Sequence, residues 1–416
     1  MAEEIFPLFR SLTGDGVRDT LARLSGITPI TVHEVPSGTP VLDWTVPKEW
    51  KVREAWLRGP DGRVIADAAD NNLHLLGYSV PFRGQVTLDE LRPRLHTMAD
   101  RPDLIPYRTA YYAETWGFCL ADSVASALEP GMYDVCIDTE LFDGNLSYGE
   151  VIIPGDDPSE VLITTHICHP STANDNVSGM VILAALGRLL GTRPGRRLTY
   201  RLLFLPSTVG SITWLATHRD VVERVNNVLV LTGLGDAGPF TYKRSRNGAT
   251  ATDRVVEHVL KHRAPDHSVM DFYPYGYDER QFGSIGFDLP VGRLTRGVHG
   301  EYPEYHTSGD DMSFIHESKM LESLEAIVDI VDVFEGDVIY RNLEPFGEPR
   351  LGIRGLYSNV GGAIDRRSYE MNLLWILSLA DGATSLLQMA ERSGQPFAAV
   401  RTAADQLVAA GLLEAV

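Results

Sequence analysis

Potential metal ligands are densest in one stretch of the chain, His166-Ile-Cys-His169-Pro-Ser-Thr-Ala-Asn174-Asp175-Asn176-Val-Ser178-Gly179. A β-rich run precedes it over 161–165, and apolar residues at helical spacing follow it over 178–190. The polar residues therefore fall in a strand-to-helix loop. In an open α/β sheet such loops border the crevice where ligands bind, and the helix start supplies N–H groups. We therefore expect a metal site at the end of a strand.

Strand and helix patterns continue to alternate from residue 160 to about 335. Further strands are predicted at 200–205 and 228–231, and further helices at 211–218, 253–263 and 319–334. Such alternation predicts an α/β fold with a largely parallel sheet and helices on both faces. Two short amphipathic helices are predicted within residues 4–24.

Residues 32–155 have a different texture. Short β-like runs at 41–46, 52–57 and 63–66 are broken by turn signals, and Pro60-Asp-Gly62 predicts a hairpin turn. These features predict a small β-rich domain. The aromatic residues concentrated between Trp44 and Trp116 are expected to form its core, with a substrate-facing wall as the alternative.

The end of the chain predicts three helices, at 372–380, 385–393 and 397–410, followed by a possible wing at 411–414. This is the spacing of a helix-turn-helix domain. The last helix offers Arg401 alone as a basic residue, so we expect the tail to serve packing or dimerisation rather than DNA binding. A homo-oligomer is the corresponding expectation.

Length and composition limit the function classes. A chain of 416 residues is long enough for two or three domains. Its formal net charge of -19 argues against a nucleic-acid partner, and its three widely spaced cysteines do not resemble a disulfide framework. The start is acidic and no apolar run reaches the ~18–20 residues that span a bilayer. We expect a cytoplasmic protein without a membrane partner.

Further polar segments are predicted at the ends of the same strands. Ser207 follows the strand at 200–205, and Asp236 follows the strand at 228–231. Two more segments, 277–281 and 301–311, carry Asp, Glu, Tyr and His side chains. Imidazole and carboxylate ligands without an obligate cysteine suit a catalytic zinc ion, so Cys168 is interpreted as part of the wall.

These motifs resemble the M28-type zinc aminopeptidases, which have a phosphorylase/hydrolase-like α/β core. The resemblance rests on His166, Asn174-Asp175-Asn176-x-Ser178-Gly179, the isolated Asp236 and His306-Thr-Ser-x-Asp. Three segments are more closely similar to aminopeptidase-like proteins often described as polysaccharide biosynthesis proteins: His166-Ile-Cys-His-Pro170, Tyr275-Gly-Tyr-Asp-Glu-Arg-Gln281 and Glu304-Tyr-His-Thr-Ser308. That resemblance implies a core at 1–35 and 151–344, a β-rich insert at 36–150 and a winged-helix-like domain at 345–416.

The resemblance also implies roles for individual residues. His166, Asp175 and His306 would be metal ligands, with Asp175 bridging if two metals bind, and Asp236 a further carboxylate ligand. The family has an Asp where Cys168 stands, and His169 is a candidate ligand that compensates for it.

One departure concerns the general base. M28 enzymes have a Glu-Glu pair after the next strand, and the nearest relatives keep one Glu, whereas this chain has Pro206-Ser207-Thr208. Without that carboxylate pair we expect one zinc ion per chain. Serine cannot accept the proton at neutral pH, so Glu304 and Glu279 are the best candidates to replace the base.

The substrate-binding candidates are Arg280, Arg293 and Tyr305, the two arginines because they can hold a carboxylate bidentately. The leading hypothesis is a zinc-dependent, aminopeptidase-like amidohydrolase acting on a small aminoacyl or peptide-like substrate, within a biosynthetic pathway. One rival is a metal-binding protein that has lost hydrolysis, motivated by Ser207. The other is a regulatory protein whose tail binds a partner or nucleic acid.

Overall fold

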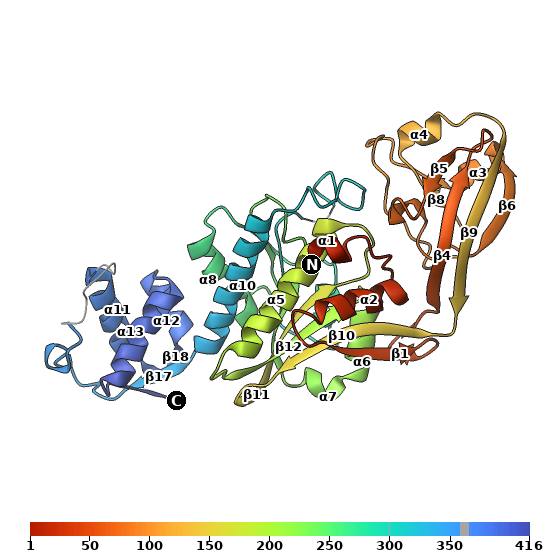
Figure 1. Ribbon diagram of the computed structural model, residues 1–416. Helices are drawn as coiled ribbons and strands as arrows, with labels where there is room; N and C mark the ends of the chain where they lie inside the picture. The colour runs from red at the N-terminus through yellow and green to blue at the C-terminus, as the bar shows by residue number, and fades with distance from the viewer. Residues whose placement is uncertain (299, 358–365) are drawn as a thin grey trace. The chain divides into compact units, whose positions relative to one another are not determined.

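The computed structural model describes residues 1–298, 300–357 and 366–416 (Figure 1). Its largest sheet among these residues has eight strands in the order β1-β10-β12-β11-β13-β16-β14-β15. The bounds are β1 Thr31–Pro36, β10 Asn145–Ile153, β12 Leu198–Leu205, β11 Asp157–His166, β13 Val225–Leu231, β16 Val291–Thr295, β14 Thr241–Lys243 and β15 Ser268–Met270. The central strands β12, β11, β13 and β16 run parallel. Strand β10 is antiparallel to β1 and β12, and β14 is antiparallel to β16. The predicted mixed, mostly parallel sheet is confirmed.

Helices cover both faces of this sheet. On one side lie α2 (Asp15–Leu24) and α5 (Gly179–Thr192), and on the other lie α6 (Val209–Thr217) and α7 (Arg219–Val222) (Figure 1). Both faces of the sheet are buried, and residues of the central strands such as Leu162, Leu203 and Val230 have no exposed surface. This burial explains why the central strands are almost continuously apolar.

The register of the parallel strands aligns their carboxyl ends. His166 of β11 pairs with Leu205 of β12, and Leu231 of β13 pairs with Leu294 of β16. The loops that follow these strands therefore leave the sheet at one edge, as the sequence predicted.

A four-stranded antiparallel sheet forms the β-rich region, in the order β5-β4-β9-β6. Its strands are β4 (Glu49–Arg58), β5 (Val64–Asp67), β6 (Phe82–Thr87) and β9 (Met132–Phe142). Gly62, at φ +79°, makes the predicted turn between β4 and β5. The prediction of a single strand at 41–46 is wrong, because the segment forms a hairpin of β2 (Pro40–Val41) and β3 (Trp44–Thr45). The chain turns at Leu42, which has φ +57°.

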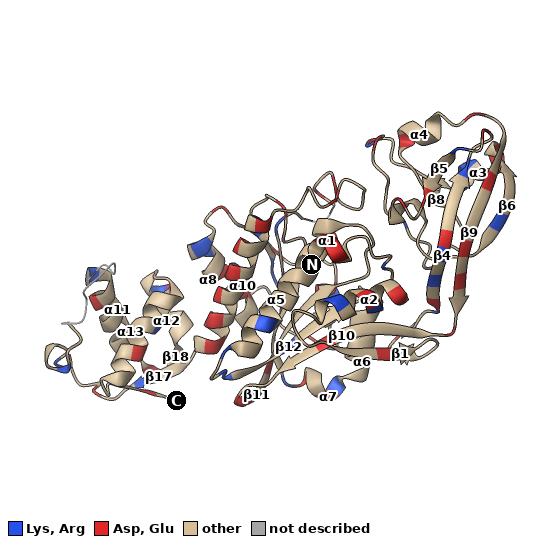
Figure 2. Ribbon diagram, viewed as in Figure 1, with Lys and Arg blue, Asp and Glu red and all other residues tan. Residues whose placement is uncertain are grey.

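A second compact unit comprises Asp253–His267 and Glu325–Val416. It contains α8 (Ala251–Arg263) from Asp253 onward and the later part of α10 (Glu317–Gly336). Helices α11 (Arg366–Leu379), α12 (Leu386–Ser393) and α13 (Phe397–Ala409) accompany a sheet of β17 (Ile339–Asn342), β18 (Asp381–Ser385) and β19 (Leu413–Ala415). Acidic and basic residues are interspersed along these helices (Figure 2).

Helix α12 begins with a capping box between Ser385 and Gln388 and ends at Gly394 in the left-handed conformation, which explains the sharp turn before α13. Besides Asp253–His267, the second unit includes the chain from Glu325 onward, whereas the winged-helix-like domain that the resemblance implies begins at 345. Within the described ranges, no helix is both long enough and apolar enough to cross a bilayer.

Candidate metal centre

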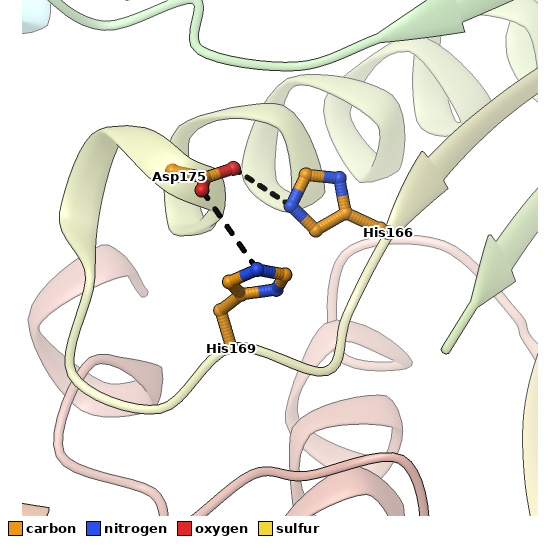
Figure 3. Close-up of side chains that lie close together, drawn as sticks. All are labelled: His166, His169 and Asp175. Carbon is orange, nitrogen blue, oxygen red and sulfur yellow. Dashed lines mark ion pairs between the residues drawn. The ribbon is translucent and has the colours of Figure 1, made fainter. Parts of the chain in front are cut away.

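The centre is built around the carboxylate of Asp175. Strand β11 ends at His166, and the chain returns through a short helical segment, η3 (Ala173–Ser178), that carries Asp175 back beside it. His166 Nε2 lies 2.8 Å from Asp175 Oδ1, and both side chains are fully buried. His169, from the loop between them, faces the other oxygen, with its Nε2 3.8 Å from Oδ2 (Figure 3).

A fourth side chain arrives from a segment remote in sequence. His306 Nε2 lies 3.0 Å from Asp175 Oδ2 and 3.1 Å from His169 Nε2. Three imidazole nitrogens and one carboxylate thus converge. His166, His169 and Asp175 each present a ligand atom, and these atoms lie within 4.8 Å of one another.

The protonation states suit metal binding. Burial lowers the pKa of His169 well below its usual value, which favours the neutral imidazole. Burial alone would raise the pKa of Asp175, but the neighbouring His169 and His166 hold it well below its usual value. A carboxylate and neutral imidazoles are the forms that bind a metal ion.

The geometry of the cluster fits a shared cation. Two buried atoms, His166 Nε2 and Asp175 Oδ2, make no hydrogen bond of ordinary geometry, although each lies at ion-pair distance from another member of the cluster. Leaving buried polar atoms unsatisfied costs stability unless something else occupies them. Nitrogen and oxygen donors in this ratio are those of catalytic zinc sites.

Surrounding groups orient the predicted ligands. The Asp310 carboxylate accepts hydrogen bonds from the backbone N–H of Asn174 (2.6 Å) and of Asp175 (2.9 Å). Burial raises the pKa of Asp310 to about 8. The Tyr277 hydroxyl lies 3.2 Å from Asp175 Oδ1, and its ring stacks on His166 at 4.9 Å. Such outer contacts fix the ligands in place.

The β-rich region also contributes to the centre. Tyr107 donates its backbone N–H to the carbonyl of His306 at 2.7 Å, and its ring centroid lies 5.1 Å from those of His169 and His306. Ser308 donates its backbone N–H to the carbonyl of Ile105 at 2.8 Å. Tyr107 therefore forms part of the wall, a role that only the aromatic concentration between Trp44 and Trp116 suggested.

Asp236 is hydrogen-bonded to the loop that carries Asp175. Its carboxylate accepts hydrogen bonds from Asn174 Nδ2 (2.8 Å) and from the backbone N–H of Gly297 (2.8 Å) and Gly238 (2.7 Å). The first of these bonds ties Asp236 to the loop that carries Asp175, and the ligand role expected of Asp236 stays a prediction.

Glu279 is also engaged elsewhere. It lies in α9 (Glu279–Phe282), and its buried carboxylate pairs with Lys243 Nζ at 2.9 Å and with Arg293 Nη1 at 3.3 Å. Burial would raise the pKa of Glu279, but Arg293 and Lys243 lower it. A carboxylate held between two cations is a poor proton acceptor, which argues against Glu279 as the base.

The remaining predicted residues occupy different environments. Glu304 is half-buried, and only its backbone carbonyl has a hydrogen bond, from Thr307, in the described part of the chain. Arg280 is exposed, whereas Arg293 is buried and, with Asp175 and Tyr277, lines a small cavity. The Tyr305 ring stacks on His306 at 3.9 Å.

Ser207 lies next to a carboxylate that the sequence prediction passed over. Its Oγ donates to Asp278 Oδ1 at 3.0 Å, and Ser211 Oγ donates to the same oxygen at 2.8 Å. Asp278 is fully buried, and burial raises its pKa above the usual value. The base expected from the sequence in this segment is the next residue, Glu279, and no role is expected there for Asp278.

A family model described as a domain of unknown function, DUF4910, matches residues 1–337. The chain belongs to the DUF4910 family. A second model, for a winged helix-turn-helix domain, matches residues 338–415, which confirms the winged-helix-like fold predicted for the tail.

This DUF4910 chain is 43% identical over 416 residues to a protein of Clostridium acetobutylicum, covering 100% of this chain and 95% of that one. The relative carries the provisional name polysaccharide biosynthesis protein with aminopeptidase-like domain. A crystal structure from the same organism, provisionally described as a peptidase, matches with a TM-score of 0.95 and 42% identity, over 100% of this chain and 95% of that chain.

More distant matches show the same fold. The zinc aminopeptidase BSAP from Bacillus subtilis aligns with a TM-score of 0.57 and 12% identity, over 80% of this chain and 94% of that chain. A peptidase M28 precursor from Shewanella amazonensis aligns with a TM-score of 0.55 and 12% identity, over 80% of this chain and 92% of that chain. The resemblance to M28-type aminopeptidases read from the sequence is confirmed.

Proposed function

We propose that this protein is a zinc-dependent hydrolase that cleaves an amide bond in a small aminoacyl or peptide-like substrate. One observation carries the proposal: His166, His169, Asp175 and His306, drawn from two distant segments, converge within ion-pair distances in the crevice at the strand ends. The aminopeptidase fold supports a reaction of this class, and the name of the Clostridium relative supports a biosynthetic role.

The residues of the centre would have two roles, to bind the zinc ion and to hold its ligands in place. His166, Asp175 and His306 would hold the zinc ion, with His169 as a fourth donor or as the neighbour that orients His306. When bound, zinc supplies Lewis-acid activation of water and of the substrate carbonyl. Asp310 holds the backbone of Asp175, and Tyr107 holds that of His306, so that both side chains are pre-organised.

We also propose that the chain binds a single zinc ion. The second metal of an M28-type pair needs carboxylates at the position of Thr208 and of Asp236. Thr208 has no charge, and Asp236 is hydrogen-bonded to Asn174, Gly238 and Gly297. A second dication beside the first would therefore be poorly neutralised.

Substrate recognition is proposed to involve Arg293 and Tyr305. Arg293 lines the cavity beside Asp175, and Tyr305 covers His306. Arg280 is exposed, so a role in substrate binding would require it to lie at the rim of the crevice. We propose a small or short peptide-like substrate and no nucleic-acid partner.

The test compares the zinc-loaded and chelator-treated protein on a panel of aminoacyl amides and aminoacyl p-nitroanilides. We expect turnover that disappears with 1,10-phenanthroline and returns with added zinc, and a His306→Ala variant that fails to recover. Turnover that survives chelation would contradict a zinc hydrolase.

One observation favours a second candidate, a metal-binding protein without hydrolysis: Ser207 stands where the M28 enzymes have their general base. Stoichiometric zinc without turnover on any member of the panel would support it.

A further inference from the structure

Amide hydrolysis at this centre requires a proton acceptor. The attacking water must lose a proton, and the leaving amine must gain one. Strand β12 ends at Leu205, and the residues after it, Pro206, Ser207 and Thr208, carry no charge. A carboxylate is nevertheless present at that strand end, because Asp278 reaches it from a different segment.

Two hydroxyl groups hold one oxygen of Asp278. Ser207 Oγ donates to Oδ1 at 3.0 Å, and Ser211 Oγ, in the first turns of α6, donates to it at 2.8 Å. The side chain is fully buried. These bonds fix the orientation of the carboxylate but occupy only one of its oxygens.

The other oxygen of Asp278, Oδ2, differs from the first. Oδ2 of Asp278 is buried and makes no hydrogen bond with the described part of the protein. A buried carboxylate oxygen accepts hydrogen bonds readily, and leaving it unsatisfied costs stability. An oxygen without a hydrogen-bond donor is suited to accept a proton that arrives during a reaction.

Contacts connect Asp278 to the metal centre. Cys168 Sγ lies 3.6 Å from the carbonyl of Ser207 and 3.3 Å from His169 Nδ1, so Ser207 and the cluster share a neighbour. On the other side, the residue before Asp278 is Tyr277, whose hydroxyl lies 3.2 Å from Asp175 Oδ1. Asp278 is thus linked to the predicted ligands only through other residues: through Tyr277 to Asp175, and through Ser207 and then Cys168 to His169.

We infer that Asp278 is the catalytic proton acceptor of this centre and replaces the carboxylate that Ser207 lacks. The inference rests on the proposed hydrolase function. Asp278 Oδ2 takes the proton as an O–H bond of water breaks and the water oxygen bonds to the substrate carbonyl carbon. The same proton then passes to the amine nitrogen as the C–N bond breaks. Water and amide are thereby converted to acid and amine, with Asp278 returned to its starting form.

The surroundings tune Asp278 for this task. Burial raises its pKa, His166 and the two serine hydroxyl groups lower it, and Glu279 raises it again. Cys168 also faces Asp278, and burial raises the pKa of that thiol to about 12, so it remains neutral. A general base works best when its pKa lies closer to neutrality than that of a free carboxyl.

The first experiment uses Asp278→Asn, which preserves the shape and both hydroxyl neighbours. Asp271→Asn is the matched control, because it makes the same substitution in the same segment between β15 and α9. Asp271 is an exposed carboxylate that pairs with Arg244 Nη1 at 2.9 Å. We expect Asp278→Asn to lower kcat on the aminoacyl p-nitroanilide panel by ~10²–10⁴-fold, with zinc affinity unchanged. Retained turnover, or loss only in Glu304→Gln, would overturn the assignment.

A second variant separates catalysis from mere packing. Ser211→Ala removes one hydrogen bond that lowers the pKa of Asp278, so the acidic limb of the kcat/KM profile is expected to move to higher pH. A limb that stays in place would show that another group accepts the proton.

A third measurement is independent of turnover. A hydroxamic acid loses a proton when it binds a zinc centre, and a nearby general base takes that proton up. Acetohydroxamate is titrated calorimetrically into zinc-loaded protein in two buffers of different ionisation enthalpy. We expect about one more proton to reach the buffer with Asp278→Asn than with the wild type. Equal release in both would overturn the role of Asp278 even if no substrate is found, whereas failure of the proposed function alone would leave this difference intact.

Discussion

Ser207→Glu restores the carboxylate of the M28 enzymes, and the structure predicts that it harms this protein. Ser207 Oγ lies 3.0 Å from Asp278 Oδ1, so a glutamate there would face a buried carboxylate. At a separation of about 4 Å, two like charges repel by about 4 kcal/mol with an effective dielectric constant of about 20. Because the pair can share one proton, the free energy of unfolding at pH 8 is expected to fall by at most this amount, about 1–4 kcal/mol.

The stability of the Ser207→Glu variant is expected to fall as the pH rises. Repulsion raises the folded-state pKa of the carboxyl pair above its unfolded value, so the folded state binds more protons. Stability that is present at low pH is therefore lost as the pH rises through the raised pKa. The penalty of Ser207→Glu should be small near pH 4–5 and largest at pH 8.

The assay is urea unfolding of the metal-free protein at pH 5 and pH 8, followed by tryptophan fluorescence. Ser207→Gln is the matched control, because it has the same size and no charge. We expect the glutamate variant to unfold at lower urea than the glutamine variant at pH 8 and at nearly the same urea at pH 5. Equal midpoints at pH 8 would refute the placement of Asp278 beside Ser207.

Three further predictions concern the centre and the tail. Tight zinc binding, measured by elemental analysis after dialysis, should be abolished by His166→Ala, by Asp175→Ala and by His306→Ala, and only weakened by His169→Ala. Zinc retained in full by any of the first three variants would contradict the ligand set. Asp310→Ala removes the acceptor of two backbone N–H groups and should weaken zinc binding by ~10–100-fold, while Asp311→Ala, at an exposed neighbour, should not; equal affinities for the two variants would exclude the positioning role. Truncation after residue 344 should lower solubility or change the oligomeric state seen by light scattering, because it removes residues that contact α8. These include Phe397, whose backbone N–H donates to His258 Nε2, and Glu391, which pairs with Arg254; a truncated protein that stays soluble with an unchanged oligomeric state would contradict the prediction.

The sequence predicted the features that depend on local pattern. The strand ending at His166, the loop carrying Asp175 and the following helix are contiguous, so periodicity and residue type were enough to identify them. The alignment of strand ends followed from the parallel topology, which alternation of strands and helices indicates.

Other features depend on tertiary packing and could not be predicted. Tyr107 reaches His306 only because the β-rich region folds against the segment before α10, and nothing in its local sequence specifies that contact. The choice between Asp278 and Glu279 turns on the start of α9, where successive side chains point about 100° apart. One therefore meets Ser207, while the other meets Lys243 and Arg293.

The most direct test of the account is diffraction from crystals grown with zinc, with data collected on both sides of the zinc absorption edge. The account predicts one anomalous peak per chain, within ~2.0–2.2 Å of a nitrogen of His166, a nitrogen of His306 and an oxygen of Asp175. Two peaks of equal height would contradict the single-zinc centre. A peak away from these three residues, or none at saturating zinc, would contradict the centre itself.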